Sequence, residues 1–189
     1  MKLSFLNNIL LAGRIILPAI LCFLFNYLGN GYDHFEIIII PFSLLIVLPN
    51  FDKIKLNIFK TLVLSLLFSC ITFFASILLP LGIGYPIEFL LKLNNTSENL
   101  SEFIFKLIAI ISYCIISPAI IFFWHKKLFI ILKNGLTKKI TFLTYIVLIV
   151  TLFAIEIKAS LAIASWQFIM VLALQLRLYK DELKTLSLG

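Results

Sequence analysis

The stretch His125–Lys139, HKKLFIILKNGLTKK, places five lysines between two long apolar runs. The run before it ends at Trp124, and the run after it begins at Ile140. Lys and Arg are enriched in the short cytoplasmic loops of membrane proteins. The stretch therefore predicts that two membrane spans meet at the cytoplasmic face, and it orients the rest of the chain.

The composition supports this membrane class. Of the 189 residues, 62% are hydrophobic and 13% are charged, and the mean hydropathy is +1.12. Soluble domains are about 45–50% apolar and about 25% charged, so a soluble fold could not bury this much apolar surface. A transmembrane β-barrel needs alternating segments of about ten residues, whereas runs such as Ile146–Val150 are continuous. We predict an all-α, polytopic transmembrane helical bundle.

The apolar runs predict six spans in a single membrane domain. They are expected at residues 9–28, 36–50, 61–84, 106–124, 140–156 and 159–176, before a short charged cytoplasmic tail at 177–189. The third span ends at Pro80–Pro86, a stretch of helix breakers where a helix is expected to stop. The fifth and sixth spans are expected to form a tight hairpin, and the alternative is one continuous helix from Ile140 to Tyr179.

The charges orient these spans. With six spans and a cytoplasmic N-terminus, only Lys92, Lys106 and Lys158 of the sixteen Lys and Arg residues fall outside. The second apolar run is short for a bilayer core of about 30 Å. If it did not cross, however, the basic clusters would be divided between the two faces of the membrane. We therefore expect both termini in the cytoplasm, in a multi-pass protein of the bacterial cytoplasmic (inner) membrane.

The residue types of catalysis and metal binding are scattered. His34 and His125 fall on opposite sides of the predicted membrane, and Cys22, Cys70 and Cys114 lie singly in apolar runs without a metal-binding spacing. A serine nucleophile would need a base at membrane depth, and we identify none. We expect no metal, no cofactor and no catalytic constellation, which favours a non-enzymatic protein. The net charge of +7 is explained by anchoring of the spans, so no nucleic-acid partner is expected.

Polar groups inside or at the ends of the spans are the remaining candidate sites, because ionisable groups in a membrane are functional hypotheses by default. They are Arg14, Glu156, Lys158, Gln167 and Gln175. Each also has a structural interpretation, as a snorkelling anchor or as part of an interhelical hydrogen bond. The basic loop is expected to face anionic lipid headgroups, through Lys126, Lys127, Lys133, Lys138 and Lys139.

Two functions fit this pattern. Short loops and the lack of a catalytic motif favour a small protein that acts by contact with a membrane protein partner, as an accessory subunit or an immunity or resistance protein. The alternative is a transporter or permease subunit for a small solute, in which proline-broken helices shape the path. An enzyme that acts on lipid through the basic loop is a distant third hypothesis.

Overall fold

The computed structural model describes residues 2–29, 34–93, 98–131, 135–154 and 159–186. The elements in these ranges are all helical, which confirms the predicted all-α class. In chain order they are α1 (Lys2–Leu28), α2 (Phe35–Val47), η1 (Leu48–Lys53), α3 (Ile58–Leu79), η2 (Pro80–Gly84), α4 (Tyr85–Leu93), α5 (Glu98–Ile110), η3 (Ile111–Ile116), α6 (Ser117–Leu128), α7 (Gly135–Ala154) and α8 (Ala159–Leu186). The segment η1 is a 3-10 helix, whereas η2 and η3 are π-helical.

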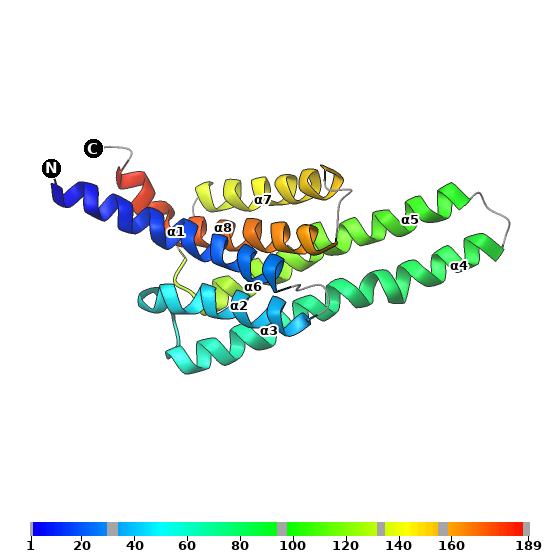
Figure 1. Ribbon diagram of the computed structural model, residues 1–189, viewed down its shortest axis with the longest axis horizontal. Coiled ribbons are helices and arrows are strands. Elements are labelled where there is room, and N and C mark those ends of the chain that lie inside the picture. Colours follow the sequence, from blue (N-terminus) through cyan, green and yellow to red (C-terminus); the bar gives the residue numbers. More distant parts are fainter. Residues whose placement is uncertain (1, 30–33, 94–97, 132–134, 155–158, 187–189) are drawn as a thin grey trace.

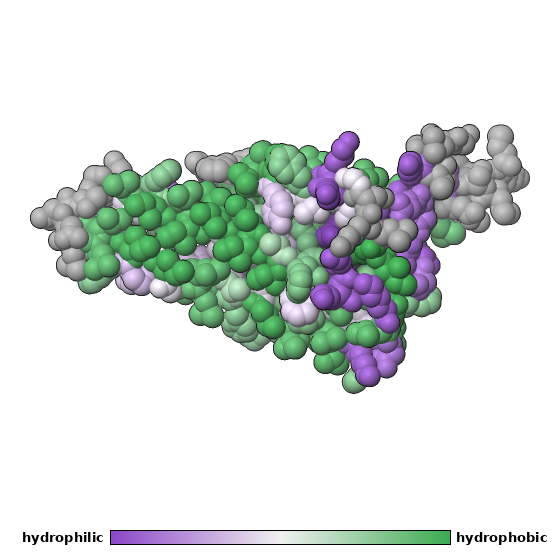
Figure 2. Space-filling view, turned by 180° about the vertical axis from the view of Figure 1, so that it is seen from behind, coloured by the Kyte–Doolittle hydropathy of each residue, from purple (hydrophilic) through white to green (hydrophobic). Residues whose placement is uncertain are grey.

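Six helices or helix stacks among the described residues are long and apolar enough to cross a membrane. They cover Asn8–Leu28, Phe35–Lys53, Ile58–Leu91, Phe103–Leu128, Gly135–Leu152 and Ser160–Lys184. Successive crossings run in opposite directions, so α1 begins and α8 ends at the same end of the bundle (Figure 1). Hydrophilic residues gather at this end, which we call the charged end (Figure 2). By helix length and composition, the structure supports the multi-pass class.

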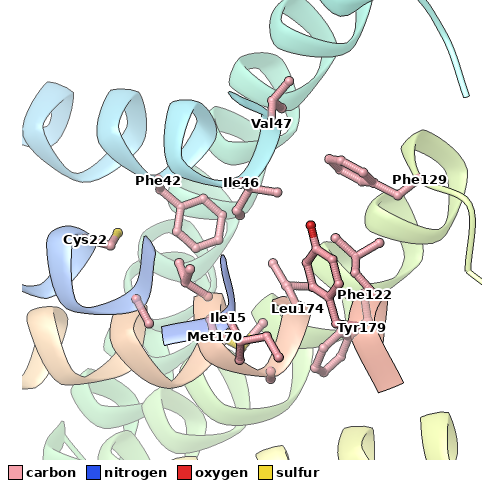
Figure 3. Packing of buried hydrophobic residues seen from close by; sticks show 14 of the residues in the cluster. Ile15, Cys22, Phe42, Ile46, Val47, Phe122, Phe129, Met170, Leu174 and Tyr179 are labelled. Atoms are coloured by element: carbon pink, nitrogen blue, oxygen red, sulfur yellow. The ribbon is translucent and has the colours of Figure 1, made fainter. Parts of the chain in front are cut away.

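The helices form two layers. In one layer α1 and α7 both pack against α8, and in the other α2 and α6 pack against α3 (Figure 1). Buried side chains of both layers meet in a common core, among them Ile15 of α1, Phe42 of α2, Phe122 of α6 and Leu174 of α8 (Figure 3). Lipid tails are as apolar as this core, so close packing and polar contacts hold the helices together rather than hydrophobic burial alone.

The expected end of the third span at the breaker-rich stretch is wrong. The helical stack continues from α3 through η2 into α4, and the α4–α5 hairpin extends past the ends of the other helices (Figure 1). Pro80 has no N–H, so the carbonyl of Ser76 loses its usual partner four residues on. The hydroxyl of Ser112 in η3 donates to this carbonyl instead, at 3.0 Å. In the π-helical turn, the Tyr85 N–H donates to the Pro80 carbonyl, and the helix passes the proline without stopping.

The ends of the other spans also differ in detail from the sequence prediction. The short second run is lengthened by η1, so the crossing reaches Lys53. The sixth helix does not end near Leu176 but continues to Leu186. Within the expected charged tail, Arg177, Tyr179 and Lys180 are buried because they pack against the bundle. The helices α7 and α8 are separate and pack against each other, as a hairpin requires. Their connection, residues 155–158, lies outside the described residues.

Candidate functional site

A cavity of about 600 Å³ lies between the two layers. Most of its lining comes from the second half of α3, from α2, from the first half of α8 and from the η3–α6 segment, and η2, α5 and α7 contribute the rest. Since α3 begins and α8 ends at the charged end, this places the cavity in the opposite half of the bundle (Figure 1). Ligand pockets in proteins have volumes of about 300–1,000 Å³, so the cavity is large enough to hold a small molecule.

One wall of the cavity carries a stripe of hydroxyl side chains on α3. The stripe consists of Thr61, Ser65, Ser69, Thr72 and Ser76, all buried and spaced three or four residues apart. This spacing aligns them on one helix face, and the last three line the cavity. This stripe was not among the sites predicted from the sequence, although its helical period is a readable signal.

The hydroxyls at the cavity already have hydrogen-bond partners. Thr72 donates to the carbonyl of Phe68 at 2.8 Å, and Ser76 donates to that of Phe73 at 2.6 Å. The hydroxyl of Ser69 pairs with that of Ser43 on α2, at 2.9 Å. The α3 wall is therefore polar in composition but has few free donors for a ligand.

The facing wall carries Trp166 of α8, whose indole N–H donates to the carbonyl of Tyr113 at 2.8 Å. That carbonyl is available because η3 is π-helical. In this turn the N–H and the hydroxyl of Ser117 both bond to the carbonyl of Ser112, and Pro118 has no N–H to offer. A backbone group freed by the local helix geometry thus joins α8 to the other layer.

Gln167, one of the residues predicted from the sequence, lies at the cavity and joins three helices. Its Oε1 accepts from Nδ2 of Asn26 at 2.5 Å and from Sγ of Cys22 at 2.9 Å, both on α1. Its Nε2 donates to the carbonyl of Ile38 on α2 at 2.8 Å. Both polar atoms of its amide are therefore used inside the protein, which favours a structural role.

The charged end of the bundle is closed by polar contacts between the layers. Nη1 of Arg14 on α1 donates to Oδ2 of Asp52 in η1 at 3.1 Å. The hydroxyl of Tyr179 on α8 donates to Oδ1 of Asn50 at 2.8 Å, and Lys53 forms an ion pair with Glu182 of α8. Each of these contacts connects η1 to α1 or α8, so the two layers are held together here.

A pairing of two loops covers the same end. The Lys55 N–H donates to the Leu128 carbonyl at 2.9 Å, and the Ile130 N–H donates to the Lys53 carbonyl at 2.8 Å. Between these bonds lies Phe129, which is fully buried. Phe129 lines a small void of about 30 Å³, which has room for about one water molecule. This void shares Phe42, Ser69 and Ile121 with the large cavity. The cavity is thus closed toward the charged end.

The other predicted site residues are dispersed. Gln175 is buried on α8, and neither atom of its amide has a partner among the described residues. Glu156, Lys158 and Lys133 lie outside the described residues. The remaining lysines of the basic loop, Lys126, Lys127, Lys138 and Lys139, end α6 or begin α7, at the charged end. Within the described ranges, no group of three or more His, Cys, Asp or Glu side chains could hold a metal ion.

Comparison with known protein families, with curated proteins and with solved structures finds no match to this chain.

Proposed function

We propose that this protein is a non-enzymatic, multi-pass protein of a bacterial cytoplasmic membrane, with both termini in the cytoplasm. The support is that hydrophilic residues gather at the end where α1 begins and α8 ends (Figure 2). Lys and Arg of η1, α6, α7 and α8 lie there, and such residues are enriched on the cytoplasmic side of membrane proteins. The arrangement of the helices fixes which loops share an end of the bundle. The charges then indicate which end faces inward.

Labelling of single cysteines tests this orientation, in a variant whose three native cysteines are replaced by serine or alanine. Cysteines at positions 30 and 95 should react with a membrane-impermeant thiol reagent added to intact cells. A cysteine at position 139 should react only after the cells are opened. Labelling at position 139 from outside would contradict the orientation.

We further propose that the protein binds an apolar molecule in its cavity, as a transporter or permease subunit would. The observation that carries this proposal is the cavity itself. Its lining is mostly apolar, and its hydroxyl, indole and amide donors are largely engaged with protein atoms. A hydrocarbon chain could enter without breaking those bonds, whereas a strongly polar solute would find few free partners.

Photolabelling of the purified protein with a diazirine-bearing long-chain fatty acid tests this proposal. The probe should label peptides of α3 and α8 that line the cavity. The substitution Ala162→Phe adds a ring on the cavity wall and should reduce labelling about tenfold or more, which corresponds to a loss of roughly 1.4 kcal/mol of binding free energy. The control Leu78→Phe adds bulk at an exposed position of α3 and should leave labelling unchanged. Equal labelling of all three proteins would exclude the cavity as the binding site.

Action by contact with a membrane protein partner is the second candidate function. It is favoured by the α4–α5 hairpin, which extends beyond the other helices and exposes Tyr85, Phe89 and Phe103 (Figure 1). Aromatic side chains are enriched at protein interfaces. Substitutions separate the two functions. A protein that acts by contact should remain active when Ala162→Phe fills the cavity, and it should lose activity when the exposed aromatic residues of the hairpin are replaced.

A further inference from the structure

Arg177 of α8 is a buried cation that has no anionic partner among the described residues. Its side chain lies with the guanidinium carbon 4.4 Å from the centre of the Phe122 ring, and the residue is 6% exposed. Within the described ranges, Nε and Nη1 have no hydrogen-bond acceptor and no carboxylate forms an ion pair with the side chain. Arg14 and Lys53, by contrast, each pair with a carboxylate.

The surroundings of Arg177 come from three helices. Phe122 and His125 lie one turn apart on α6, and Tyr145 of α7 packs edge-on against Phe122, with ring centres 6.1 Å apart. His125 is buried, and neither of its ring nitrogens has a hydrogen-bond partner in the part of the chain that the structure describes. Two unpartnered side chains that can donate hydrogen bonds thus lie at the junction of α6, α7 and α8, against an aromatic wall.

This junction lies at the level of the charged end. Lys126 and Lys127 follow His125 directly, Lys138 and Lys139 lie in the first turns of α7, and α8 continues into further charged residues. A buried unpaired guanidinium is unfavourable, and its planar fork matches the paired oxygens of a phosphate group. A basic band at the end of membrane spans is where the phosphates of anionic lipids lie.

We propose that Arg177 binds a phosphate group at the junction of α6, α7 and α8, supplied by an anionic lipid or by free phosphate. The guanidinium holds the phosphate through two donors, and the lysines of α6 and α7 raise its local concentration. The Phe122 ring holds the guanidinium plane in place. This site does not depend on what occupies the cavity, since it lies on another helix junction.

Thermal unfolding of the purified full chain in detergent tests this site, with the fluorescence of its two tryptophans as the readout. Phosphatidylglycerol at about a hundredfold above its Kd should raise the Tm by about 5 °C or more, and phosphatidylcholine should not. The shift should disappear in Arg177→Gln and persist in Lys60→Gln, which removes one charge at an exposed position of α3, outside this junction. Inorganic phosphate, measured against sodium chloride at equal ionic strength, identifies the source. If inorganic phosphate raises the Tm and phosphatidylglycerol does not, the ligand is the free ion. If phosphatidylglycerol raises the Tm and inorganic phosphate does not, the ligand is the lipid headgroup.

The proposal is overturned if neither phosphate source stabilises the wild-type protein, or if Arg177→Gln gains the same shift as wild type. If Arg177→Gln does not fold, Arg177→Lys keeps the charge without the fork and should show a reduced shift. Native mass spectrometry of the wild-type protein then gives an independent result. Phosphatidylglycerol should be retained in preference to phosphatidylcholine, and equal retention of the two lipids would contradict the site.

Discussion

Replacing Gln167 by leucine is expected to destabilise the bundle by about 2 kcal/mol. Three hydrogen bonds join this side chain to α1 and α2, and a bond between membrane helices contributes about 0.6 kcal/mol on average, with values up to about 1.7. The substitution also removes one of the two acceptors of Asn26 Nδ2, which then keeps only the Cys22 carbonyl. A buried N–H that loses its acceptor carries a further cost.

Gln175 provides a matched control on the same helix. It is also buried, but neither of its amide atoms has a partner among the described residues. Gln175→Leu should therefore leave stability unchanged or raise it by about 1 kcal/mol, because it removes an unsatisfied buried amide. The free energy of unfolding, measured by titration with dodecyl sulfate in mixed micelles, compares the two variants. Equal losses would mean that the hydrogen bonds of Gln167 contribute little.

Replacing Tyr179 by alanine is expected to have the largest effect on stability, a loss of about 3–5 kcal/mol. The ring is almost completely buried in the core at the charged end (Figure 3). Its hydroxyl bonds to Asn50, and the ammonium group of Lys53 lies 4.7 Å from the ring centre. The substitution therefore creates a cavity and also removes a contact that joins α8 to η1.

Two further substitutions separate these contributions in the same unfolding assay. Tyr179→Phe keeps the ring and removes only the hydroxyl, and it should cost about 1 kcal/mol. Tyr85→Ala truncates a tyrosine that is 61% exposed and should change stability by less than about 0.5 kcal/mol. If Tyr179→Ala cost no more than Tyr85→Ala, the ring would not belong to the core.

The number of spans could be predicted from the sequence because each crossing needs about 20 mostly apolar residues. The order of the lysine clusters also predicted that the α6–α7 connection shares an end with both termini. In the structure, the start of α1, the end of α6, the start of α7 and the end of α8 lie at the same end of the bundle (Figure 1). These features depend on local composition, which a sequence displays directly.

The continuation of α3 past Pro80 could not be predicted, because it depends on a contact far away in the chain. The breakers at Pro80–Pro86 indicate a helix end, and the hydroxyl that replaces the lost hydrogen bond comes from Ser112.

The contacts of the candidate site also depend on residues far apart in the chain. Arg14 and Gln167 could be identified as polar groups in spans, but nothing local indicates that Asp52 and Asn26 are their partners. The hydroxyl stripe on α3, by contrast, is visible in the sequence as a helical period.

The uneven helix lengths have a consequence for access to the cavity. At 1.5 Å per residue, the stack from Ile58 to Leu93 is roughly 50 Å long, whereas the hydrocarbon core of a bilayer is about 30 Å thick. If the charged end lies at the cytoplasmic surface, Ser69 to Leu78 fall in roughly the outer half of the bilayer, and the far parts of α4 and α5 extend beyond it. A molecule would then enter the cavity from the outer leaflet, while the η1 contacts and Phe129 separate it from the cytoplasm. Access to the cavity would then be one-sided.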